Sequence, residues 1–180
     1  QIDFVNQVAR ELSLAENYDA AFICWVLEHI SEPIRVLKSM RPFLEPKAKV
    51  VITEVFNATF YTYPLYPEIM EYWKVYNDYQ VNIGGDPQVG AKLGDLLEEA
   101  GYKDISLRSG GFHLDKRNSE DKKIIFTYWK NLMSSGAPLL LEEGLVTGSQ
   151  IKAMQDAMDQ LSERKDSIFY YRFIQATAFA

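Results

Sequence analysis

The chain has 180 residues, of which 47% are hydrophobic and 24% are charged, as is ordinary for a globular domain. It carries 25 Asp and Glu against 19 Lys and Arg, a net charge of -6. This balance argues against a nucleic-acid substrate, because such binding rests mainly on basic groups that neutralise phosphates. A single cysteine, Cys24, permits no internal disulfide and fits a reducing cytoplasm, and no apolar stretch approaches the length of a membrane-spanning helix. We therefore expect a cytoplasmic protein with neither nucleic acid nor a membrane as a partner.

The chain opens at Gln1 rather than at a methionine, and directly in strand-like sequence at residues 2–5. We interpret it as the C-terminal portion of a longer protein, so that the fold is incomplete at its N-terminus.

A continuous apolar run, residues 20–27, follows the acidic turn residue Asp19 and breaks into Glu28 and His29. An apolar run without polar alternation is typical of a strand buried on both faces, as in parallel sheets. Such strands present ligand-binding groups at their carboxyl ends. Residues 24–29 therefore occupy the place where a site is expected.

Helix and strand patterns alternate along the rest of the chain. The expected elements are a helix that Ser31 caps and Pro46 ends, a strand parallel to the first at 50–55, a helix at 86–100, a strand at 102–108, helices at 119–133 and 149–163, and an antiparallel last strand at 168–180. A capping box, Thr147 to Gln150, begins the second of the two late helices. This alternation predicts an α/β fold with a Rossmann-like, mostly parallel sheet flanked by helices. The apolar stripes of the late helices suit packing on the sheet and a homodimer contact equally.

Four segments, in order, resemble class I S-adenosylmethionine-dependent methyltransferases. Residues 18–30 are similar to the family's fourth strand, F-D-x-V-x-x-x-x-V-L-E-H-I/L, and residues 40–54 to its passage R-x-L-K-P-G-G-x-L-x-I-x-E. Residues 90–102 resemble its helix and turn L-x-x-L-L-x-x-A-G-F, and residues 8–12 its loop G-D-A-x-x-L. The resemblance covers about residues 1–110 and the last strand. It implies a single partial methyltransferase-like domain over 1–180, with a cap insertion at about 56–85 and a helical elaboration at about 115–165.

The resemblance implies S-adenosylmethionine as the cofactor. It places the donor against residues of the third-strand loop and the fourth-strand end: Val8, Ala9, Cys24, Trp25, Leu27 and His29. The alternatives are purely structural roles: Trp25 and Leu27 are core residues, His29 caps a helix, and Cys24 is a small buried hydrophobic residue. The chain departs from the family where Val8 replaces an aspartate, and it has no glycine-rich loop E/D-x-G-x-G-x-G. We therefore expect these 180 residues alone to bind the donor poorly.

Residues 56–79 hold nine of the chain's 24 aromatic residues. In the family, the insertion after the fifth strand folds over the active site and selects the acceptor. Flat apolar rings with hydroxyl groups suit a small aromatic or lipophilic molecule. The candidate acceptor-binding residues are Tyr61, Tyr63, Trp73, Tyr76 and Tyr79. The alternatives are a small aromatic core of the cap itself or a dimer contact.

A hydroxyl acceptor needs a base, and the candidates are Glu54, at the end of a strand, and His113, after the next one. Their alternative roles are a loop anchor and a surface residue. No metal site is expected, because the chain has two histidines and no clustered cysteines. The sequence predicts methyl transfer to a small molecule; the alternative is a non-catalytic methyltransferase-like binding or assembly module.

Overall fold

The computed structural model describes residues 2–180, which divide into two compact units. Unit 1 comprises the residues up to Phe56 together with Gly84–Gly110 and Phe173–Ala180, and unit 2 comprises Asn57–Ile83 and Gly111–Arg172. The chain thus leaves unit 1 twice and returns to it twice. Strands β4 (Lys103–Leu114) and β5 (Ile168–Phe179) contribute residues to both units.

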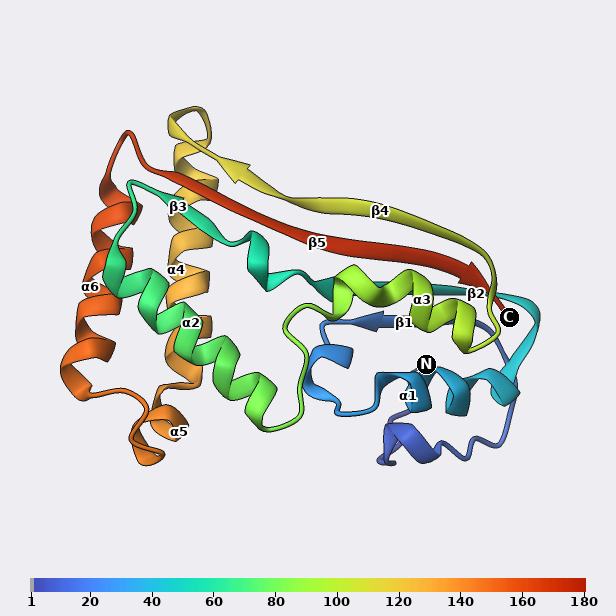
Figure 1. The fold of residues 1–180 in the computed structure, drawn as a ribbon. Coiled ribbons are helices and arrows are strands. Elements are labelled where there is room, and N and C mark those ends of the chain that lie inside the picture. The colour runs from blue at the N-terminus through green and yellow to red at the C-terminus, as the bar shows by residue number, and fades with distance from the viewer. Residues whose placement is uncertain (1) are drawn as a thin grey trace. The chain divides into compact units, whose positions relative to one another are not determined.

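A mixed sheet forms the framework of unit 1 (Figure 1). Strand β1 (Tyr18–Cys24) pairs in parallel with β2 (Leu44–Val55), and β5 pairs antiparallel with β2. Five strands are hydrogen-bonded in the order β1-β2-β5-β3, where β3 is Tyr61–Tyr63, with β4 also paired to β5. The predicted Rossmann-like α/β fold and its antiparallel last strand are confirmed: the sheet is parallel at its start and antiparallel later.

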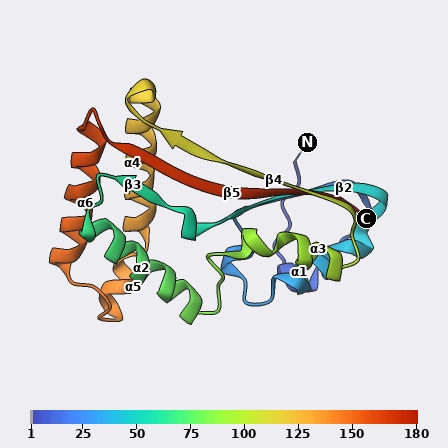
Figure 2. The ribbon, with the colours of Figure 1, turned by 45° about the horizontal axis from the view of Figure 1, so that its top comes forward.

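Two helices cover one face of the unit 1 sheet. Figure 2 shows α1 (Pro33–Met40) and α3 (Leu93–Glu99) on the same side of β2 and β5. The short 3-10 helices of this unit are η1 (Ala9–Glu11), η2 (Leu27–His29), η3 (Arg41–Phe43) and η5 (Val89–Lys92). Apolar residues at helical spacing meet the β-branched residues of β2, and the fully buried core includes Leu37, Val50, Ile52, Leu93 and Leu97.

Four local predictions for unit 1 are wrong. Glu32 rather than Ser31 is the N-cap residue of α1, and Pro46 does not end the helix but lies within β2. Residues 2–5 form no strand, and Ile2 and Phe4 are exposed. The first strand is not buried on both faces, because the side chains of Ala20, Phe22 and Cys24 along one face of β1 are exposed, Phe22 to 69%. Strand β1 is also an edge strand, whose one partner in the described chain is β2. The helix expected from residue 86 begins at Leu93, since the Asp86 carboxylate accepts the N–H of Gln88 and holds a turn there.

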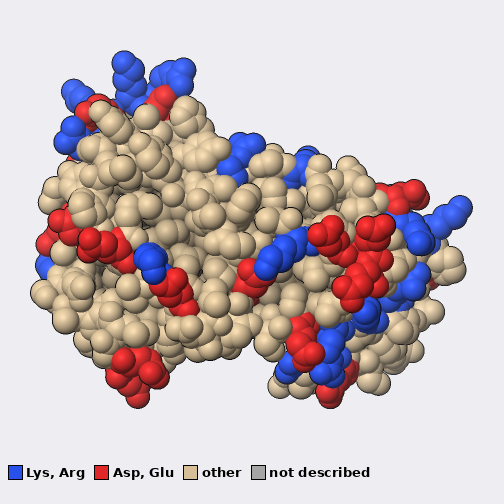
Figure 3. Space-filling model, viewed as in Figure 1, with Lys and Arg blue, Asp and Glu red and all other residues tan. Residues whose placement is uncertain are grey.

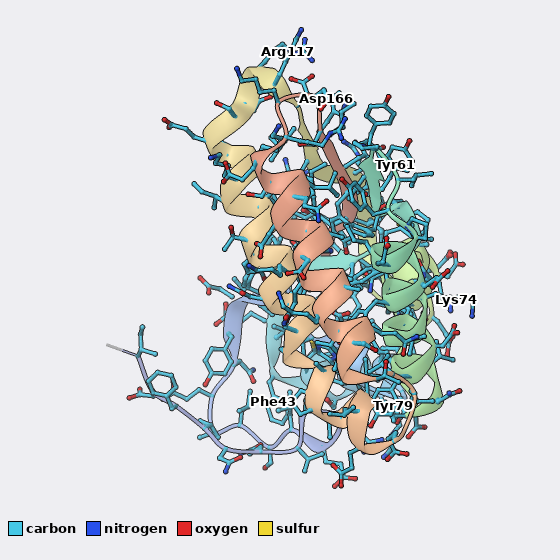
Figure 4. The ribbon with its side chains drawn as sticks, turned by 90° about the vertical axis from the view of Figure 1, so that its left-hand side faces the viewer. Phe43, Tyr61, Lys74, Tyr79, Arg117 and Asp166 are labelled. Carbon is cyan, nitrogen blue, oxygen red and sulfur yellow. The ribbon has the colours of Figure 1, made fainter. Side chains whose placement is uncertain are left out.

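Unit 2 is built from helices α2 (Pro67–Asn82), α4 (Ser119–Ser135), α5 (Ala137–Glu142) and α6 (Gly148–Glu163), with η4 (Asn57–Thr59), η6 (Lys116–Asn118) and strand β3 (Tyr61–Tyr63). Figure 4 shows α6 between α4 and α2. The predicted capping box is confirmed: Gln150 N donates to Thr147 Oγ1 at 3.2 Å, and Thr147 N donates to Gln150 Oε1 at 2.8 Å. Strand β3 pairs antiparallel with β5.

Aromatic rings fill the core of unit 2. The Trp129 ring lies 4.5 Å from that of Tyr171 and 5.1 Å from that of Phe169, and it stacks on Phe60. Lys122 is buried beside this core, and its Nζ donates to the Arg164 carbonyl at 2.7 Å. Burial lowers the pKa of Lys122. The dense packing explains why so many aromatic residues occur in this part of the chain.

The surface is mixed in charge. On the face shown in Figure 3, acidic and basic side chains are interspersed, with wide areas that carry no charge. Within residues 2–180, no helix is both long enough and apolar enough to cross a lipid bilayer.

Candidate functional site

The candidate site lies at the carboxyl ends of the parallel strands β1 and β2 in unit 1. The register sets Cys24 beside Thr53, and Trp25 N donates to the Thr53 carbonyl at 2.9 Å. Trp25 has a φ of 52°, a left-handed conformation that is uncommon for a residue other than glycine. The chain therefore leaves β1 in a sharp turn, which leads directly into η2.

Glu54 anchors this turn from the end of β2. Its side chain is 0% exposed, and Oε1 accepts the N–H groups of Val26 at 2.9 Å and Leu27 at 2.8 Å. Burial raises the pKa of Glu54; the two N–H donors oppose this shift, and the negative charge of Glu28 adds to it. Glu54 Oε2 and Trp25 Nε1 are also buried, and neither has a hydrogen-bond partner within the described residues.

Helix η5 closes against the same end of the sheet. The N–H of Asp86 donates to the Glu28 carbonyl at 2.8 Å, and Lys92 pairs with the Asp86 carboxylate at 2.7 Å. A Cβ atom on Gly90 would lie 2.5 Å from the Val55 carbonyl oxygen, which is too close for any residue that has a Cβ atom. The glycine therefore permits direct contact between the backbone of η5 and the end of β2.

A hollow of about 230 Å³ lies beside the turn, and it brings together three of the residues predicted to hold the donor. Its lining consists of Val8, Ala9, Arg10, His29, Ile30 and Ser31. The His29 side chain is 61% exposed. Arg10 donates to Ser31 Oγ at 3.4 Å and to Glu32 Oε2 at 3.3 Å, so its guanidinium joins the two sides of the hollow.

The other three predicted donor residues lie elsewhere. Leu27 is completely buried in the core, and Trp25 packs partly against it. Cys24 is exposed and borders a second, apolar hollow of about 420 Å³ on β1. Partial desolvation and then the charge of Glu54 raise the pKa of the Cys24 thiol, which disfavours the reactive thiolate.

The five predicted acceptor residues do not converge on one cavity of unit 2. Trp73 is buried, donates through Nε1 to the Asn57 carbonyl at 3.2 Å and stacks on Tyr76 at 5.6 Å. Tyr61 and Tyr63 are exposed on β3, and Figure 4 shows Tyr61 and Tyr79 at opposite ends of the unit. Trp73 and Tyr76 thus pack against each other, and the acceptor role of all five residues stays a prediction.

The two candidate bases belong to different units. Glu54 is buried in unit 1, whereas His113 lies exposed on β4 in unit 2, with its ring 6.2 Å from that of Tyr170. Across residues 2–180, no group of three or more His, Cys, Asp or Glu side chains is placed to hold a metal ion. Sequence reasoning missed the close approach at Gly90, for which a glycine ahead of an amphipathic helix was the one available signal.

No protein family model and no curated protein sequence matches the chain. Among solved structures, a protein of Bacillus halodurans C-125 described as a methyltransferase superposes with a TM-score of 0.54 at 12% identity, over 99% of this chain and 77% of that one. A protein from an antibiotic biosynthesis pathway of Anabaena variabilis, also described as a methyltransferase, gives a TM-score of 0.51 at 11% identity, over 95% and 71% of the two chains.

Phosphoethanolamine N-methyltransferase 2 of Haemonchus contortus, solved with phosphomonomethylethanolamine and S-adenosylhomocysteine, gives a TM-score of 0.47 at 15% identity. The match covers 96% of this chain, which spans only 36% of that protein. The two superpositions with a TM-score above 0.5 extend over 99% and 95% of this chain, and so include its parallel β1–β2 pair and its antiparallel last strand. The chain therefore has the fold of class I methyltransferases.

Proposed function

We propose that this chain is part of an S-adenosylmethionine-dependent methyltransferase that acts on a small aromatic or lipophilic molecule. The observation that carries the proposal is the hollow beside the end of β1, where Val8, Ala9 and His29 meet in a chain with a methyltransferase fold. In open α/β sheets, ligands bind outside the carboxyl ends of the strands. The proposal includes a cytoplasmic location, with neither nucleic acid nor a membrane as a partner.

The residues present fit a part of the donor. The hollow of about 230 Å³ is smaller than most small-molecule sites, which hold roughly 300–1,000 Å³. Val8 and Ala9 offer an apolar wall, and His29 offers an exposed ring. The open edge of β1 supports the idea that additional polypeptide pairs there and completes the site.

The bound donor would supply an electrophilic methyl group on a sulfonium. Transfer of a methyl group is an in-line displacement, so the protein contributes mainly by holding the two reactants close and aligned. Tyr61 and Tyr63, which are exposed, are the proposed contacts for the acceptor in unit 2. For a hydroxyl acceptor we propose His113 as the base, because the carboxylate of Glu54 is buried.

One observation favours a non-catalytic binding or assembly module instead. Val8 lines the hollow where the resemblance expects an aspartate, and its side chain cannot hydrogen-bond a ligand.

Calorimetric titration of S-adenosylhomocysteine tests the proposal, with the natural full-length protein and the 180-residue chain measured side by side. We expect saturable micromolar binding, roughly -8 kcal/mol, by the full-length protein alone. Absence of binding by both forms would refute the enzyme hypothesis and favour the non-catalytic module.

A further inference from the structure

The end of β2 holds three successive N–H groups of the turn after β1. Trp25 N donates to the Thr53 carbonyl, and the N–H groups of Val26 and Leu27 both donate to Glu54 Oε1. A side-chain carboxyl thus takes the place of the next acceptor in the ladder, at the point where the two strands separate. The left-handed Trp25 lies inside this set of bonds and is held by it.

Two backbone hydrogen bonds connect the turn to the hollow. The Val26 carbonyl accepts the N–H of His29 at 3.1 Å, and the Leu27 carbonyl accepts the N–H of Ile30 at 3.1 Å. Both acceptors belong to residues whose own N–H groups donate to Glu54, and both donors belong to residues that line the hollow. The position of His29 and Ile30 therefore depends on Glu54 through two short hydrogen-bonded links.

A buried carboxyl at this place is unfavourable in itself, because burial of a polar group costs free energy unless its hydrogen bonds are made. An apolar residue would avoid that cost but would leave the N–H groups of Val26 and Leu27 without an acceptor. Glu54 has no contact with solvent, since it is 0% exposed. Its contacts are those of a support for the turn rather than of a base.

We propose that Glu54 is a positioning residue for the donor site: it fixes the turn Trp25–Leu27, and through that turn it holds His29 and Ile30 in the arrangement that binds the methyl donor. This inference rests on the proposed function, because it assigns a ligand to the hollow.

The test compares Glu54→Gln and Glu54→Leu in the natural full-length protein. Glutamine keeps a carbonyl oxygen for both N–H groups, whereas leucine fills the space without an acceptor. We expect Glu54→Leu to lower the hydrogen-exchange protection of the Val26 and Leu27 amides, and the affinity for S-adenosylhomocysteine, by at least about tenfold each, and Glu54→Gln to change both by less than about threefold. Leu93→Ala is the control for general loss of stability, since Leu93 is buried in the same core but belongs to α3 and not to the turn. It should leave both readouts near those of the wild type.

Each outcome bears on the inference. If Glu54→Leu keeps the amide protection, or loses it while binding the ligand as the wild type does, Glu54 does not position the site. Equal loss of affinity in Leu93→Ala would show a general effect of stability and would also overturn it. If the wild type does not bind S-adenosylhomocysteine, the proposed function is refuted, and the positioning role with it. If the wild type and Glu54→Leu bind it equally well, only the positioning role is refuted.

Discussion

At the scale of single residues, Glu54 should make stability depend on pH. Burial, and to a lesser extent Glu28, raise the pKa of Glu54 above its usual 4.5. The folded state then holds the proton more tightly than the unfolded chain. The contribution of Glu54 to the free energy of unfolding is therefore highest below pH 4.5 and falls as pH rises through the raised pKa. We expect Glu54→Gln to remove this fall, as measured by urea unfolding from about pH 4 to about pH 8.

The comparison must be made as a difference between wild type and variant, because other carboxyl groups act with the opposite sign. Hydrogen bonds from Arg117 lower the pKa of Asp115 to about 2, and those from Arg164 lower the pKa of Asp166. Their stabilisation is present at neutral pH and is lost as pH falls towards these lowered values. Both groups remain in Glu54→Gln, so their contributions cancel. A wild-type-minus-variant difference that stays flat, or that grows with pH, would contradict the prediction.

At the scale of secondary-structure elements, the contact between η5 and β2 should tolerate no side chain at position 90. A Cβ atom there would lie 2.5 Å from the Val55 carbonyl and 2.7 Å from that of Glu54, and both obstacles are backbone atoms. We expect Gly90→Ala to lower the free energy of unfolding by about 1–3 kcal/mol in urea titrations.

Gly94→Ala is the matched control in the neighbouring helix α3. Its Cβ atom would lie 3.1 Å from Cδ1 of Leu107, a half-exposed side chain that can move, and alanine favours the helix more than glycine does. We expect a change close to zero. If Gly90→Ala and Gly94→Ala lower the free energy of unfolding equally, the close approach to the β2 carbonyls is not what restricts position 90 to glycine.

The order of the elements could be predicted from sequence because helices and strands carry different apolar periods, and because a capping box such as Thr147 to Gln150 acts locally. The exposure of β1 could not, since an apolar run indicates which side chains avoid water but not whether a neighbouring strand is present. The late start of α3 depends on the Asp86 carboxylate, which competes with the helix for a backbone N–H.

The candidate site, like the fold, could be predicted in part. Chain order and resemblance placed Val8, Ala9 and His29 at one location, and the hollow unites them. The role of Glu54 as an anchor remained one of two readings, because a carboxyl that turns inward to the backbone of another strand leaves no periodic signal. The burial of Trp73 could not be predicted, since an aromatic cluster in a sequence is compatible with a core and with the lining of a pocket.

At the scale of the whole chain, the open edge of β1 should cause self-association. The outer edge of this strand has no strand partner in the described residues, and its flank is apolar, with Phe22 69% exposed and Tyr18 44% exposed. Strand β1 contains no lysine or proline, the residues that commonly block pairing at an edge. We expect the 180-residue chain to associate as its concentration rises in sedimentation velocity experiments, and Phe22→Lys to suppress this.

Phe4→Lys is the control, because Phe4 is 94% exposed but lies in an irregular segment outside the strand. If both variants suppress association equally, general apolar exposure rather than the strand edge drives it. If neither variant suppresses association, the edge of β1 does not mediate it. A natural full-length protein that stays monomeric while the 180-residue chain associates through Phe22 would indicate that further polypeptide covers β1. The same polypeptide would then lie next to Cys24 and the turn that follows it, beside the hollow that we propose binds the donor.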